Sequence, residues 1–482
     1  MSATELGAGL ALLLIAIAAV ARIAGSAESI VLAAHNLPWA VALLVWSSGL
    51  IRYDAVPASS MLVLACGIVS FNVGAFASHV NPARAAAVQN VKFQQILLPR
   101  RTYVGLWFGY ATGFVWLLLT IKHYFGLSAL LTNPRIIRTY SSIDYLQKFP
   151  LPGKLLFYLA PLLMALTANP ALVVGLADRP RLARYTLYGL LIVTQFASLQ
   201  RTNIFVGIVW SVAVALMGAR TNHSVHHSSA KLSGSPGTRK RRRRWHVAVA
   251  GVVGAVICFQ LLGSVLGKTT STDVRYTPYL ASSVNKEPLA SALLYGSSGI
   301  EGFLALTQST NHAWPPSVQP PIYGNYNPMT YGAATFSIIP KFIPLFMPWP
   351  EVGPFINVPF PTNVYTWLDP WYRDFRAPGV ALLAFAIGFA ATSFVRRRRC
   401  SVRGLLLAGL IVTSIVWAPF TNRILSTMTL ELGIVVYMLC RPRAGDVWPV
   451  SKTQIDADHG AKALSRNGTG MMRIDQGGYG RP

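Results

Sequence analysis

Two arginines stand at the tips of predicted helical hairpins, in the tetrapeptides Gln-Arg-Thr-Asn (200–203) and Phe-Thr-Asn-Arg (420–423). The apolar stretches that flank them, as helices, would span only about 21–24 Å, less than the roughly 30 Å hydrocarbon core of a bilayer. Arg201 and Arg423 are therefore expected below the membrane surface. Each either extends to the lipid headgroups or lines a cavity, where its planar guanidinium would bind phosphate groups. Arg135 and Arg138, in another loop, are candidates for the same role.

Several titratable side chains could exchange a proton with a substrate. Glu301, Asp374, His123 and His312 fall in segments predicted to lie on the same side of the membrane as the two hairpin tips. Glu431 falls inside an apolar stretch, where a carboxylate serves either as the partner of a buried donor or directly in function. The acidic residues lack the spacing of a metal site, so we expect no metal and no cofactor.

The amino-acid composition indicates that these residues belong to a membrane protein. Of 482 residues, 53% are apolar and 12% are charged, whereas soluble domains carry roughly 25% charged residues. The formal net charge of +26 could indicate a nucleic-acid partner. The basic runs 241–244 and 396–399 adjoin apolar stretches, however, where Lys and Arg set membrane topology, so we expect no nucleic acid. The cysteines show no CxxC spacing and support neither disulfides nor zinc.

Eleven apolar stretches predict an all-α polytopic membrane protein. They are residues 6–21, 30–51, 57–76, 103–121, 155–176, 185–199, 204–217, 247–266, 379–395, 405–419 and 424–439. The loops on one side hold 28 Lys and Arg residues and those on the other hold 14. By the positive-inside rule the richer side is cytoplasmic, which puts the amino terminus outside and the carboxyl terminus in the cytoplasm.

The chain thus divides into a bundle of eight helices (1–266), an outer segment (267–378), three more helices (379–440) and a tail (441–482). The tail and the basic loop 219–244 are polar enough to predict disorder. The outer segment holds 19 aromatic residues and 16 prolines, too apolar a mixture for disorder. It contains two predicted helical pieces, 289–306 and 335–347, and its aromatics either anchor it at the lipid interface or stack on sugar rings.

Residues 361–388 contain a motif that resembles the signature of bacterial O-antigen polymerases, the Wzy-type oligosaccharide repeat unit polymerases. In that family Asn-x-Tyr-Thr is followed by Asp-Phe-Gly-x-x-Gly, which opens a membrane helix. The matching positions here are Asn363, Tyr365, Thr366, Asp374, Phe375 and Gly379. The segments 295–303 and 331–344 also resemble outer-loop segments of the family, in the same order. The departure is Arg376, which stands where the family has glycine.

The resemblance implies a GT-C-like glycosyltransferase of the bacterial plasma membrane that acts on undecaprenyl-diphosphate glycans at the outer face. The growing chain would be transferred to a hydroxyl of an incoming lipid-linked repeat unit. The four arginines would bind the diphosphate, and Asp374 is the first choice for a polar role near the acceptor, followed by Glu301, His123 and His312. Alternatively, Asp374 caps a helix beginning near Gly379 or pairs with Arg373, while Asn363 and Thr366 form a turn.

Beyond its lipid-linked substrate and membrane lipids, such an enzyme could work with a flippase and with chain-length regulator proteins. Two other functions stay open at this stage. An O-antigen ligase would pass the same kind of glycan to a different acceptor, and sequence separates the two poorly. A flippase or other transporter for lipid-linked sugars would need charged residues along a transmembrane path, and among the predicted spans only Glu431 clearly supplies one.

Overall fold

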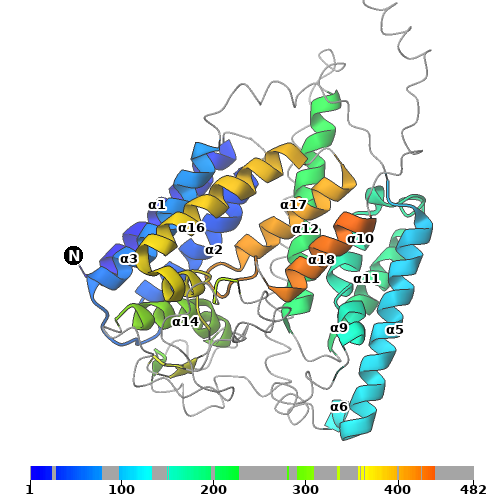
Figure 1. Cartoon of the computed structure of the whole chain (residues 1–482), viewed down its shortest axis with the longest axis horizontal. Coiled ribbons are helices and arrows are strands. Elements are labelled where there is room, and N and C mark those ends of the chain that lie inside the picture. The colour runs from blue at the N-terminus through cyan, green and yellow to red at the C-terminus, as the bar shows by residue number, and fades with distance from the viewer. Residues whose placement is uncertain are drawn as a thin grey trace, which may run out of the picture. The chain divides into compact units, whose positions relative to one another are not determined.

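The chain folds predominantly into helices, several of which are suited to a bilayer (Figure 1). The computed structural model describes residues 2–23, 29–78, 97–132, 149, 151–196, 201–226, 279–281, 290–308, 334–336, 356–358, 360–362, 364–398, 401–424 and 426–439. Five of the described helices are long and apolar enough to cross a membrane. The chain is therefore an all-α membrane protein in its main features. The predicted span 247–266 and the tail lie outside the described residues. Of the loop 219–244, predicted to be disordered, residues 219–226 continue a helix that begins at Arg201, and residues 227–244 lie outside the described residues.

A first group of helices comprises α1, α2, α3, α14 and α16. Helix α1 packs along α2, α3 packs along α16, and α14 lies against α2 and α3. The bounds are α1 (Ala3–Ile23), α2 (Ser29–Ser47), α3 (Ala58–Ala77), α14 (Ala290–Thr307) and α16 (Asp369–Arg398). The predicted helix 289–306 is thus confirmed, within one residue at each end.

Helices α3 and α16 approach each other so closely that two glycines are needed. A Cβ at Gly74 of α3 would overlap the carbonyl oxygen of Phe385, and a Cβ at Gly388 of α16 would overlap that of Phe71. Lipid tails are as apolar as leucine, so helices in a membrane associate largely through such close packing and not through the hydrophobic effect. These two glycines therefore fix how α16, which follows the sequence motif, is held in the bundle.

A second group contains α5, α9, α10, α11 and α12, with α10 packed between α12 and α11. Their bounds, with the short elements beside them, are α5 (Arg100–Phe125), α6 (Ala129–Thr132), α9 (Leu151–Phe157), α10 (Ala160–Ala168), η2 (Pro170–Leu172), α11 (Arg181–Phe196) and α12 (Arg201–His226). The prediction of one helix over 155–176 is wrong. The helix breaks before Pro161 and ends before Pro170, because proline lacks the N–H that continues a helix.

Helix α17 (Val402–Val416) joins the two groups, and α18 (Thr427–Leu439) packs on α17. The indole nitrogen of Trp210 in α12 donates to the carbonyl oxygen of Leu406 at 2.9 Å. A Cβ at Gly409 would come within 2.6 Å of Val214, so α12 and α17 are also in close contact. Helix α17 is consequently held closely against α12 of the second group.

Segments predicted to lie on the same side of the membrane contact each other at each end of the bundle. At one end Arg52 donates its backbone N–H to Tyr279, and Ala281 donates to Leu50. At the other end the guanidinium of Arg396 donates to the carbonyl oxygen of Ser78 at 3.4 Å. These contacts agree with the predicted alternation, while the side of the membrane that each end faces stays a prediction.

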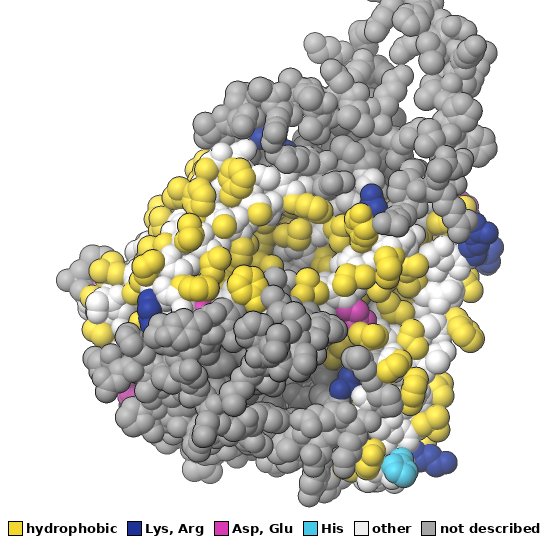
Figure 2. Space-filling model, viewed as in Figure 1, with side chains coloured by type: hydrophobic (Ala, Val, Ile, Leu, Met, Phe, Trp, Pro, Cys, Tyr) yellow, Lys and Arg dark blue, Asp and Glu magenta, His cyan; other side chains and the backbone are white. Residues whose placement is uncertain are grey.

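Apolar side chains cover much of the helical surface, over α16, α17 and α18 in the view of Figure 2. Large apolar residues that are at least a third exposed include Leu12 and Leu13 of α1, Phe108 of α5, and Leu382 and Phe389 of α16. A surface of this kind would aggregate in water and is stable against lipid tails.

Helix α16 begins at Asp369, ten residues before the predicted start of its span at 379. The helix is interrupted at Arg376, two residues before Pro378, and then continues to Arg398. A short antiparallel pair, β1 (Ile356–Asn357) and β2 (Pro361–Thr362), precedes it. The predicted helix 335–347 is described only at residues 335–336, so most of it lies outside the described residues.

We predict that Gly74→Ala destabilises the protein, because its Cβ cannot fit against the Phe385 carbonyl without separating α3 from α16. Overpacking of this kind costs about 1–3 kcal/mol. The melting temperature of the detergent-solubilised protein should fall accordingly. Gly105→Ala in α5 is the matched control, since no atom lies within 4 Å of a Cβ added there. Equal melting temperatures for both variants would contradict the proposed role of Gly74.

Candidate functional site

Helix α14 is positioned by backbone contacts that only glycine permits. A Cβ at Gly299 would overlap the carbonyl oxygen of Pro419 in the α17–α18 turn, and one at Gly302 would lie 2.8 Å from the carbonyl oxygen of Val364. Trp367 in turn donates its backbone N–H to Ala418 at 2.8 Å. Helix α14, the motif segment 364–368 and the α17–α18 turn therefore meet at one place, which is the candidate site.

Glu301 of α14 is the most deeply buried acid at this place, with 1% of its surface exposed. Its Oε2 accepts a 2.7 Å hydrogen bond from the indole nitrogen of Trp46 at the end of α2. Burial, opposed by the Trp46 hydrogen bond and aided by the charge of Asp54, raises the pKa of Glu301 to about 7. Glu301 is thus a carboxyl group able to take up and release a proton near neutral pH.

The hydroxyl of Tyr53 lies 2.6 Å from Oγ of Ser297, one turn before Glu301 on α14. Burial raises the pKa of Tyr53, so the phenol stays protonated. Trp46 therefore ties α14 to the end of α2, and Tyr53 ties it to the segment between α2 and α3. The acid is therefore held by rigid aromatic neighbours, which fixes its position.

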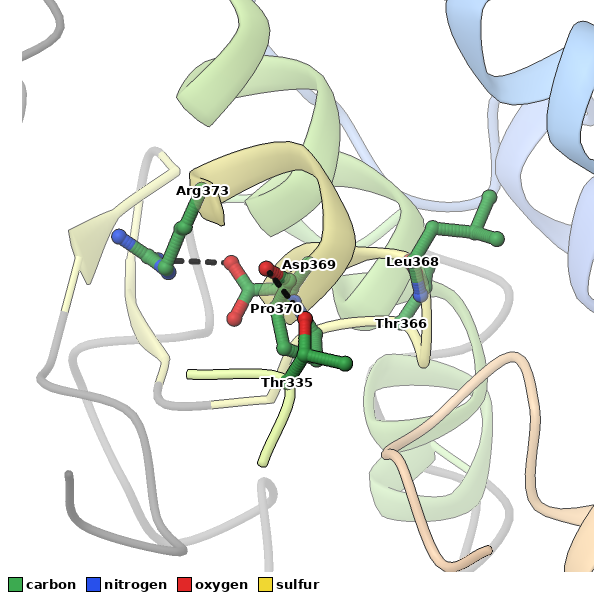
Figure 3. Close-up of polar contacts among 6 residues, drawn as sticks. All are labelled: Thr335, Thr366, Leu368, Asp369, Pro370 and Arg373. Atoms are coloured by element: carbon green, nitrogen blue, oxygen red, sulfur yellow. Dashed lines mark hydrogen bonds and ion pairs between the residues drawn. The ribbon is translucent and has the colours of Figure 1, made fainter. Parts of the chain in front are cut away.

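Asp374 is also buried, but both of its oxygens are already used. Oδ2 accepts from the backbone N–H of Thr335 at 2.7 Å and Oδ1 from that of Ala334 at 3.4 Å. The hydroxyl of Thr335 points to the carbonyl oxygen of Pro370 at 3.5 Å, as Figure 3 shows. Asp374 thereby fastens residues 334–335 of the outer segment to α16, a structural role other than the helix cap or the pair with Arg373 considered from the sequence.

The start of α16 carries an ion pair beside Asp374. Arg373 lies 2.7 Å from Asp369, one helical turn earlier (Figure 3). Its guanidinium is 5.4 Å from the centre of the Tyr365 ring. Thr366 accepts the backbone N–H of Leu368 at 3.3 Å, so it forms the turn that leads into the helix. Asn363, with which Thr366 was expected to form a turn, lies outside the described residues, so that turn stays a prediction.

Arg423 lies in the α17–α18 turn at the candidate site. Its guanidinium is 5.8 Å from the ring of Trp417, and Trp417 contacts the ring of Phe205 at 4.7 Å. Phe205 lies one turn after Arg201, the first residue of α12. The starting end of α12 and the α17–α18 turn are therefore adjacent, as a shared role for their arginines requires. Only the backbone of Arg201 is described, and Arg135, Arg138 and His312 lie outside the described residues.

The remaining candidates are more distant or differ in environment. His123 is exposed near the end of α5, a helix of the second group, beside Tyr124. Phe375 is 43% exposed, and a Cβ at Gly379 would overlap that of Phe375. Neither carboxylate oxygen of Glu431 in α18 meets a hydrogen-bond donor among the described residues. No group of three metal-ligating side chains occurs in the described part of the chain.

Sequence reasoning missed Trp46, Tyr53, Ser297 and Thr335 as members of this site. Their signal is weak, because each is an ordinary residue for its element and acquires its role only through a contact distant in sequence. Comparison of the chain with family models, with characterised proteins and with solved structures finds no match. The geometry and the sequence motif alone therefore support a functional conclusion.

We predict that the stability of the protein depends on pH through Glu301. Because the pKa of Glu301 is raised on folding, its contribution to stability is full below about pH 4.5 and is lost as the pH rises to about 7. The loss should amount to roughly 1.4 kcal/mol per pH unit within that window. The melting temperature of the wild type should fall relative to that of Glu301→Gln between pH 5 and 7. Asp178→Asn, at an exposed position, serves as control and should show the wild-type profile.

Proposed function

We propose that the protein is a membrane glycosyltransferase that polymerises undecaprenyl-diphosphate-linked oligosaccharide repeat units at the outer face of the plasma membrane, in the manner of an O-antigen polymerase. The observation that carries the proposal is the meeting of the motif segment, α14 and the α17–α18 turn at one end of the bundle. The three segments come from distant parts of the sequence and bring together a buried acid and an arginine. This is the minimal equipment for glycosyl transfer from a phosphate leaving group.

The local structure of α16 supports the resemblance on which the proposal rests. In the family pattern glycine occupies two positions after Asp-Phe. Here residue 376 has a backbone conformation (φ 58°, ψ −157°) that is essentially restricted to glycine, and Gly379 has no room for a side chain against Phe375. Both glycine positions of the pattern thus have a physical reason in this fold.

The proposed reaction breaks the bond between C1 of the growing glycan and its diphosphate, and joins C1 to the oxygen of an acceptor hydroxyl. The electron pair of the broken bond leaves with the diphosphate, and the hydroxyl proton passes to a base. We assign the base to Glu301, because its pKa lies near 7 and the oxygens of Asp374 already accept two backbone N–H groups. Arg201 and Arg423, with Arg135 and Arg138, would stabilise the charge that develops on the departing diphosphate.

A ligase would need the same groups and differs only in its acceptor, whereas a flippase would need no base. We predict that deletion of the gene in its host leaves a single repeat unit on each surface acceptor, measured as the length distribution of surface polysaccharide on gels. Complementation with the intact gene is the control. Complete chains retained on the lipid carrier would indicate a ligase, and loss of all outward-facing repeat units would indicate a flippase.

We predict that Arg201→Ala and Arg423→Ala each lower polymer formation by about 10- to 100-fold, because a charge-assisted hydrogen bond to the leaving group contributes roughly 1.5–3 kcal/mol. Polymer length and amount in the complemented deletion strain are the measurements, with membrane abundance checked by immunoblot. Arg52→Ala is the matched control, an exposed arginine at the same end of the bundle. Full activity in both variants would remove these arginines from the phosphate site.

A further inference from the structure

Arg376 adopts a backbone conformation that costs free energy. With φ 58° and ψ −157° it interrupts α16, and it is the only residue other than glycine with positive φ in the described part of the chain. Conformations of this kind in residues with a Cβ persist only where the surrounding structure enforces them, and they concentrate at functional sites. A glycine here would adopt the same backbone without strain. The arginine side chain must therefore supply something that offsets the strain.

Arg376 is half-buried, and two nitrogens of its guanidinium lack hydrogen-bond acceptors among the described residues. It lies 5.4 Å from the centre of the Tyr372 ring, which covers one face. Its Nε and Nη2 are buried and meet no hydrogen-bond acceptor within the described ranges. A buried charge without a counter-charge is strongly unfavourable, so this arrangement is suited to an anion that arrives from outside the protein.

The two nearest acids on α16 are committed elsewhere. Asp369 pairs with Arg373, and Asp374 accepts the backbone N–H groups of Ala334 and Thr335. The ion pair of Asp369 and Arg373 is neutral overall, and the carboxylate of Asp374 faces a backbone segment. No ion pair of Arg376 occurs among the residues that the structure describes.

The atoms concerned also have a specific geometry. Nε and Nη2 form one edge of the guanidinium, and their N–H bonds point the same way, which allows two oxygens of one phosphate group to be bound at once. The ring of Tyr372 covers a face of the group and leaves that edge in the guanidinium plane. The edge lies on the residue that precedes the Ala377-Pro378 step, where α16 resumes before its apolar part.

We propose that Arg376 binds a phosphate group of a lipid-borne diphosphate through Nε and Nη2, at the break in α16. This inference rests on the proposed function and adds to it a fifth arginine, at the position where this chain departs from the family pattern. The arginine at position 376 destabilises the backbone relative to glycine, and in return its side chain binds a phosphate group.

The test measures lipid binding and stability in the same variants. Full-length protein in nanodiscs of phosphatidylcholine is titrated with undecaprenyl diphosphate, and its melting temperature is recorded without ligand. Arg376→Gly should weaken binding at least about 10-fold, the equivalent of one lost charge-assisted hydrogen bond, and should raise the melting temperature because the strain is relieved. Arg376→Gln should weaken binding without the rise. Arg52→Gln, at an exposed position, should bind as the wild type does.

Unchanged affinity in both Arg376 variants would overturn the inference. Phosphatidylglycerol in the nanodisc separates the two sources of phosphate, because a headgroup that competes equally with undecaprenyl diphosphate would overturn the assignment to the substrate. The surface polysaccharide of the complemented deletion strain reports on the proposed function separately. Normal polymer with Arg376→Gly would sink the role of Arg376 alone, whereas a deletion strain with unaltered polysaccharide would sink the polymerase.

Discussion

The arrangement depends on close approach of helix backbones, which glycines make possible at a few positions. Between α3 and α16, Gly74 and Gly388 each face a carbonyl oxygen of the other helix, and between α14 and its neighbours Gly299 and Gly302 do the same. In lipid the hydrophobic effect contributes little to the association of such helices, so close van der Waals packing and polar contacts of the backbone must stabilise it. A side chain at any of these positions would displace the elements that carry Glu301, the motif segment and Arg423.

The polar groups at the site differ mainly in how each is compensated. Asp369 has a guanidinium, Asp374 has two backbone N–H groups, and Glu301 has one indole N–H in an otherwise desolvated position. The first arrangement is an ion pair, and the second is a pair of backbone hydrogen bonds. Glu301 accepts one hydrogen bond from the indole of Trp46, and burial raises its pKa to about 7. Acids of one site can thus have distinct roles because their hydrogen-bond partners differ.

Much of this could be predicted from the sequence, and the failures have physical causes. Apolar length predicts the membrane helices, and the alternation of small and apolar residues around Tyr295 and Phe303 predicts α14 to within one residue at each end, because it is a local property. The break at 158–159 and the early start of α16 were missed, since both depend on where proline is tolerated in a packed helix. The hydrogen bond from Trp46 to Glu301 joins residues 255 positions apart. No pattern within one element reports such a pair, so the role of Trp46 could not be predicted.

The contact between Trp367 and Ala418 has a consequence for the order of events during synthesis. The motif segment docks onto a carbonyl of the last helical hairpin, and Gly299 of α14 rests on Pro419 of the same turn. Domains and segments emerge from the ribosome in chain order, over seconds to minutes. Glu301 of α14 is therefore only partly enclosed until the α17–α18 hairpin has entered the bilayer. A nascent chain stopped before residue 418 would carry every residue of the motif and still lack the surface against which the motif is shaped.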